Sequence, residues 1–125
     1  MGLLSGLLGN ASEVDSEEVE RFIDSALIDG EQVEKAYKVI RDVLVFTNKR
    51  LILVDRQGVR GNKAEVLSIP YSKITKFSKE SAGTFDLDAE LKIWLGSEPN
   101  PLTKEFKAGD DIDQVYKILS QYTLG

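Results

Sequence analysis

The amino-acid sequence predicts a mainly β protein: a bent antiparallel barrel of about seven strands, capped by a C-terminal helix and preceded by an N-terminal helical segment. Three observations support this prediction. Apolar and polar side chains alternate along most of residues 32–107, apolar residues recur at helical spacing near both ends, and turn-forming residues separate the short strands. We expect two regions, an N-terminal helical extension over 1–30 and one structural unit over 31–125 that contains the barrel and the last helix.

The N-terminal region carries two helical patterns. The first is a group of four leucines at a spacing of three to four, which predicts a short, weak helix because glycines interrupt it: Leu3, Leu4, Leu7 and Leu8. The second is an amphipathic helix of about three turns with one apolar face, made of Val19, Phe22, Ile23, Ala26 and Leu27. Asp29-Gly30 is expected to end it.

The strand region begins with alternation over 33–40. Its clearest signal is a pair of apolar runs, 43–46 and 51–54, separated by Thr47-Asn48-Lys49-Arg50, which is typical of a tight antiparallel hairpin. Further strands are expected over 65–70 and 72–80, with Pro70 forcing a break or an edge between them.

The rest of the chain completes the predicted barrel. Strands are expected over 86–95 and 102–107, and a helix over 110–122 carries an apolar stripe that includes Val115 and Leu119. Because an open sheet of this size leaves exposed edges, a nearly closed barrel with the helix at its open end is favoured.

Three segments resemble the bacterial pleckstrin-homology-like (PH-like) family in its single-domain form. They are residues 45–55, residues 69–74 and residues 85–94, in this order and before a terminal helix, and the resemblance covers about residues 30–122. It implies the barrel fold, the absence of enzymatic activity, and a cyclic homo-oligomer, five-fold in symmetry, that offers a polar surface to protein partners. The natural partner cannot be derived from the chain.

Composition limits the chemistry that the chain can perform. It has no cysteine and no histidine, so thiol nucleophiles, zinc fingers and histidine acid–base relays are excluded, and we expect neither an enzyme nor a cofactor. Asp86, Asp88 and Glu90 are expected on one strand face. Calcium requires 6–8 oxygen ligands, so we interpret these acids as an exposed strip and predict no metal site. Phe85 and Trp94 flank this strand and, as aromatic residues, are expected to fill the core rather than form a ligand cage.

Nucleic acid and phosphoinositides are not expected as ligands. The isoelectric point is about 4.8, and no basic stripe alternates with aromatic residues. Phosphoinositide-binding PH domains need several cations in a long loop between the first two strands, whereas residues 40–43 offer one base, Arg41, beside Asp42. With no signal peptide and no run of about 20 apolar residues, a cytoplasmic location is expected.

Charge is unevenly distributed along the chain. Residues 1–34 have a net charge of −8, residues 35–107 of +5 and residues 108–125 of −2. Acidic helices beside basic strands within one chain, or opposite surfaces that meet between copies, both explain this pattern.

Two sets of residues are candidates for contacts. Those of the candidate interaction surface are Lys49, Arg50, Arg56, Phe85, Asp86, Asp88 and Glu90. Ordinary solvated turns are the alternative for the basic members. The second set consists of the candidate oligomer contacts Leu3, Leu4, Leu7 and Leu8. These leucines pack either on their own domain or on a neighbouring copy. A membrane-surface or anionic-lipid adaptor is the alternative function, not favoured because the leucine segment lacks basic residues.

Overall fold

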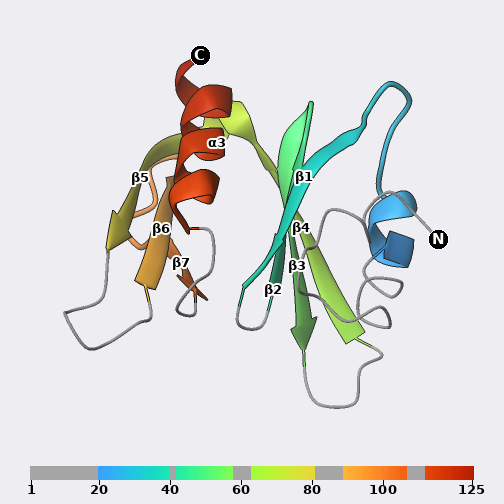
Figure 1. The fold of residues 1–125 in the computed structure, drawn as a ribbon, viewed down its shortest axis with the longest axis horizontal. Helices are drawn as coiled ribbons and strands as arrows, with labels where there is room; N and C mark the ends of the chain where they lie inside the picture. The colour runs from blue at the N-terminus through green and yellow to red at the C-terminus, as the bar shows by residue number, and fades with distance from the viewer. Residues whose placement is uncertain (1–19, 40–41, 58–62, 81–88, 107–111) are drawn as a thin grey trace. The chain divides into compact units, whose positions relative to one another are not determined.

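The computed structural model describes residues 20–39, 42–57, 63–80, 89–106 and 112–125. They form two antiparallel sheets, one of four strands in the order β1-β2-β3-β4 and one of three strands in the order β5-β6-β7, together with a C-terminal helix (Figure 1). The chain divides into two compact units, residues 1–69 and 70–125, each of which holds one sheet. The predicted mainly β class is confirmed.

The first sheet is built around the predicted hairpin. Its strands are β1 (Val33–Lys38), β2 (Asp42–Thr47), β3 (Arg50–Gln57) and β4 (Lys63–Pro70). In the hairpin, Val45 pairs with Ile52 and Leu44 with Leu53, so successive pairs point to opposite faces. Every residue of β2 is buried, which explains why this part of the sequence is a continuous apolar run.

The N-terminal helical segment covers one face of this sheet. Residues 20–24 are helical, as the apolar spacing predicts, but a turn follows at 25–26, so the helix ends before the expected stop at Asp29-Gly30. Ile23, 1% exposed, packs on a face made by Ala36 of β1, Val43 and Val45 of β2, and Ile52 and Val54 of β3. Phe22 and Leu27 add partly buried contacts to the same cluster. Figure 1 shows this blue helical turn beside the four-stranded sheet.

The second unit joins the three-stranded sheet to the last helix. It begins with a 3-10 turn, η1 (Tyr71–Lys73), and continues with β5 (Ile74–Glu80), β6 (Ala89–Leu95), β7 (Leu102–Phe106) and α3 (Ile112–Leu124). Helix α3 packs on η1, β5 and β6 (Figure 1). Val115 and Leu119 are its buried residues, both from the predicted apolar stripe.

Aromatic contacts fix the helix on its sheet. Tyr71 and Tyr122 stack with ring centroids 4.5 Å apart and an interplanar angle of 7°, and Phe77 meets Tyr116 edge to face at 5.2 Å. Lys79 also bonds Asp113 in the first turn of α3 at 2.5 Å. The helix is therefore held at both its ends.

Several local expectations are confirmed. The chain breaks after Pro70, where a 3-10 turn separates β4 from β5, and the predicted antiparallel hairpin forms between β2 and β3. The predicted end of the 86–95 strand agrees with β6, and its first residues, 86–88, lie outside the described part. The boundary at residue 31 stays a prediction. Among the described residues, no helix combines the length and apolarity needed to cross a membrane.

Candidate functional site

The turn of the β2–β3 hairpin holds a buried ion pair. The Arg50 guanidinium donates through Nε to Oε2 of Glu31 and through Nη2 to Oε1, both at 2.8 Å. Thr47 Oγ1 donates to Glu31 Oε2 at 2.6 Å, and the backbone N–H of Ile28 donates to Oε1 at 3.1 Å. The carboxylate is fully buried, whereas 21% of the Arg50 side chain is exposed. We call Glu31, Thr47 and Arg50 the hairpin cluster.

The hairpin cluster strongly favours the ionised form of its carboxylate. The hydrogen bonds from Arg50 are the largest cause, with those from Thr47 and the backbone of Ile28 adding to them. They outweigh the cost of burial and lower the pKa of Glu31 from 4.5 to about 2. The same contact raises the pKa of Arg50. Both groups are therefore charged throughout the physiological range.

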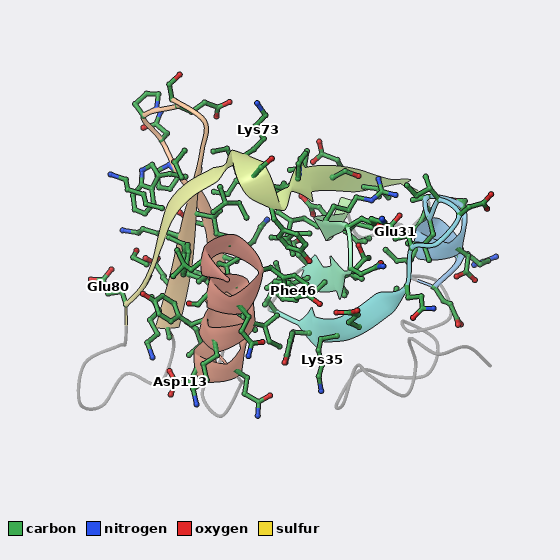
Figure 2. The ribbon with its side chains drawn as sticks, turned by 90° about the horizontal axis from the view of Figure 1, so that it is seen from above. Glu31, Lys35, Phe46, Lys73, Glu80 and Asp113 are labelled. Atoms are coloured by element: carbon green, nitrogen blue, oxygen red, sulfur yellow. The ribbon has the colours of Figure 1, made fainter. Side chains whose placement is uncertain are left out.

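Short polar side chains position the cluster. Thr47 Oγ1 accepts the backbone N–H groups of Lys49 and Arg50, at 3.0 and 2.9 Å, which closes the tight turn. Asn48 Oδ1 accepts the N–H of Gln32 at 2.8 Å, and its Nδ2 donates to the carbonyl of Gly30 at 3.0 Å. The turn residues thus bind the chain that enters β1, and Figure 2 shows Glu31 beside the helical turn.

A second feature is the polar face of the three-stranded sheet. Residues directly opposite in an antiparallel sheet point to the same side, and the register places eight side chains on the side opposite the buried Leu91 and Ile93. We call this set the outer face: Lys76, Ser78, Glu80, Glu90, Lys92, Trp94, Thr103 and Glu105. Its side chains are exposed or half-buried. Figure 2 shows Glu80 extending away from α3.

Charges on the outer face are segregated. Glu80 pairs with Glu90, and Glu90 pairs with Glu105, so three carboxylates form one row across the strands. Lys92 lies 3.8 Å from Glu80 and offsets part of this charge. Toward the other end, the Lys76 ammonium lies 4.8 Å from the ring centre of Trp94, within the range of a cation–π contact. The face combines an acidic end with a cationic and aromatic end.

The predicted contact residues that the structure describes belong to different units. Lys49 is exposed at the hairpin turn, and Glu90 is half-buried on the outer face. Arg50, predicted beside Lys49 on an interaction surface, is bound to Glu31, so most of its charge is neutralised within its own chain. The side chain of Arg56 lies outside the described part, as do Phe85, Asp86, Asp88 and the leucines at 3, 4, 7 and 8. The use of these residues as contacts stays a prediction.

Trp94 was expected in the core and is instead half-buried on the outer face, where Lys76 covers its ring. Its position between Ile93 and Leu95 forces this, because adjacent strand residues point to opposite sides. The alternation of apolar and polar residues along this strand already indicated that Trp94 lies on the polar side. Glu31 and Thr47 were missed as a pair because sixteen residues separate them and no local pattern relates them.

The described residues hold no group of three or more acidic, histidine or cysteine side chains arranged to hold a metal ion. The row of Glu80, Glu90 and Glu105 therefore does not form such a group within the described chain. The side chains of the outer face are charged, hydrogen-bonding or aromatic.

Comparison with known proteins defines the class. A sequence description of the bacterial PH domain matches residues 2–123. The uncharacterised protein YjqA of Bacillus subtilis is 50% identical over 121 residues, which cover 96% of this chain and 97% of YjqA. The uncharacterised protein YozO of the same organism is 33% identical and covers 80% of this chain and 85% of its own length.

Solved structures agree with the sequence relatives. The pleckstrin homology domain from Shewanella amazonensis SB2B has a TM-score of 0.76 at 47% identity, covering 86% of this chain and 97% of that domain. A DUF1696 family protein with a pleckstrin-homology domain from Shewanella loihica PV-4 has a TM-score of 0.72 at 48% identity, covering 86% and 92%. The chain belongs to the bacterial PH domain family, which confirms the resemblance.

Proposed function

We propose that the protein is a non-catalytic interaction module that assembles into a closed ring of identical chains and presents polar strand surfaces to protein partners. The outer face carries this proposal. Like charges directly opposite one another destabilise a sheet, yet Glu80, Glu90 and Glu105 form such a row. Lys92 offsets part of this repulsion within the chain, and a partner with complementary charge would relieve the rest.

Ring assembly rests on the distribution of charge and apolar residues. Residues 1–34 carry a net charge of −8 and residues 35–107 of +5, so different patches of two copies attract each other. Contacts between different patches close into a ring when the rotation divides the circle. The leucines at 3, 4, 7 and 8 supply apolar area for burial between neighbours. Five-fold symmetry follows from the family resemblance.

Light scattering coupled to size-exclusion chromatography tests the assembly. The chain has a mass of 13.9 kDa, so a five-membered ring has a mass of about 70 kDa. Replacing the four N-terminal leucines with serine should reduce the mass, while the matched change Leu124→Ser, at an exposed leucine of α3, should not. A mass of one chain at tens of micromolar in low salt contradicts the proposal.

A second measurement tests the outer face. Proteins retained from a lysate of the source organism should be lost on Glu90→Lys and kept on Glu98→Lys, a matched reversal at an exposed loop residue of the same unit. If both variants lose these proteins, or if both retain them, recognition by the outer face is contradicted. Sedimentation of the wild-type chain with anionic lipid vesicles would instead support the membrane-surface adaptor.

A further inference from the structure

The helical segment that covers the first sheet is attached to it by apolar side chains and by hydrogen bonds. We call residues 20–30 the cover. Its apolar side chains reach the sheet through Ile23, Phe22 and Leu27, whereas Ile28 is 61% exposed. In proteins most of the stability of a helix comes from tertiary packing rather than from its own propensity. Its position therefore depends on what fastens it to the sheet.

The fastening runs through the hairpin turn. Arg50 Nη2 donates to the carbonyl of Ala26 at 2.6 Å, near the end of the cover, while Nη1 donates to Ser68 Oγ on β4 at 2.9 Å. Glu31 binds the same guanidinium and accepts the N–H of Ile28. Asn48 adds the bond to the carbonyl of Gly30. One arginine thus connects the cover, the hairpin and the neighbouring strand.

A buried ion pair makes this attachment all-or-none. Two charges withdrawn from water are compensated only when the geometry is complete, and removing one partner leaves the other buried and uncompensated. Intermediate positions of the cover are therefore unfavourable. Gly30, at φ +81°, lies where the cover passes into β1 and tolerates backbone rotation that other residues resist. Gly30 is therefore the position at which the backbone between the cover and β1 rotates most easily.

We propose that Glu31 and Arg50, with Thr47 and Asn48, form a latch that holds the cover closed over the apolar face of the first sheet, and that opening the latch releases the cover as a unit while the sheet stays folded. The exposed face would then comprise Ala36, Val43, Val45, Ile52 and Val54.

Hydrogen exchange measured by mass spectrometry tests the latch on the full chain. In Arg50→Ala and Glu31→Gln, backbone amides of the cover should exchange about a hundredfold faster than in the wild type. Amides of β2 and β3 also accelerate because the variants are less stable, but they should remain much slower than those of the cover, since they exchange only when the sheet unfolds. Lys49→Ala is the matched control, because Lys49 is an exposed cation in the same turn, and it should exchange like the wild type. Arg50→Lys, which keeps the charge and loses the paired geometry, provides a milder variant should Arg50→Ala not fold.

The outcomes separate the latch from the assembly. A chain lacking residues 1–9 retains the latch and should keep slow exchange in the cover even if its ring dissociates. Fast exchange in that chain would show that neighbouring copies, rather than the latch, protect the cover, and would overturn the proposal. If the cover of the Glu31→Gln variant exchanged as slowly as β2 and β3, or no faster than in the wild type, the proposal would be overturned as well. Faster exchange in the cover than in β2 and β3 of this variant, with an unchanged ring mass, would support the latch as a property of the single chain.

Discussion

Acidification should remove stability that the hairpin cluster supplies at neutral pH. The pKa of Glu31 is about 2 in the folded chain against 4.5 ordinarily, so the folded state binds the proton more weakly than the unfolded state. Its contribution is complete above pH 4.5 and declines as the pH falls toward 2. The experiment is therefore to measure the free energy of unfolding of the wild type between pH 6 and pH 2 and to compare it with that of the variant Glu31→Gln, whose side chain cannot ionise.

The structure sets the expected magnitude. One pKa unit corresponds to about 1.4 kcal/mol, so the lowered pKa of Glu31 corresponds to about 3 kcal/mol of the free energy of unfolding. Breaking a buried pair by removing one partner costs about 3–5 kcal/mol in other proteins, which agrees with this value. At pH 7 the Glu31→Gln variant should be less stable than the wild type by about 3 kcal/mol, and the difference should vanish near pH 2.

Urea denaturation followed by circular dichroism at each pH measures this difference. The matched control is Asp113→Asn, which removes a carboxylate whose pKa is lowered by Lys79 but which is exposed, so it should follow the wild-type titration closely. Two stability curves that stay parallel from pH 6 to pH 2 would refute the reasoning, because they would show that Glu31 titrates alike in both states.

Three further results are expected. Leu119→Ala, at a fully buried position of α3, should lower the free energy of unfolding by about 2–5 kcal/mol in a thermal or urea melt, whereas Leu124→Ala at the exposed end should not; similar effects of both would contradict the packing of α3. Gly96→Ala should cost about 1 kcal/mol through its φ of +55° alone, since no atom lies within 4 Å of the added Cβ, and an unchanged melting temperature would contradict this. Calorimetry with soluble inositol phosphates should give no binding, because β1 and β2 are joined by only residues 39–41; micromolar affinity would contradict this.

The alternation of apolar and polar residues in the sequence already indicated much of the outer face. The alternation over 89–95 places Glu90, Lys92 and Trp94 on one side of β6, and only the expectation that aromatic residues fill cores led away from this. Their neighbours across the sheet could not be predicted, because the register that sets Glu80 and Glu105 beside Glu90 depends on how β5, β6 and β7 pair.

The sequence by itself determined the elements whose signals are local. The hairpin turn at 47–50, the break at Pro70 and the stripe of Val115 and Leu119 depend on residues within a few positions of one another. Tertiary structure alone decided the role of Arg50, because its partner Glu31 lies nineteen residues earlier. A cation in a turn can be solvated or can form an ion pair. Which of these occurs depends here on a buried carboxylate whose proximity no short-range pattern reveals.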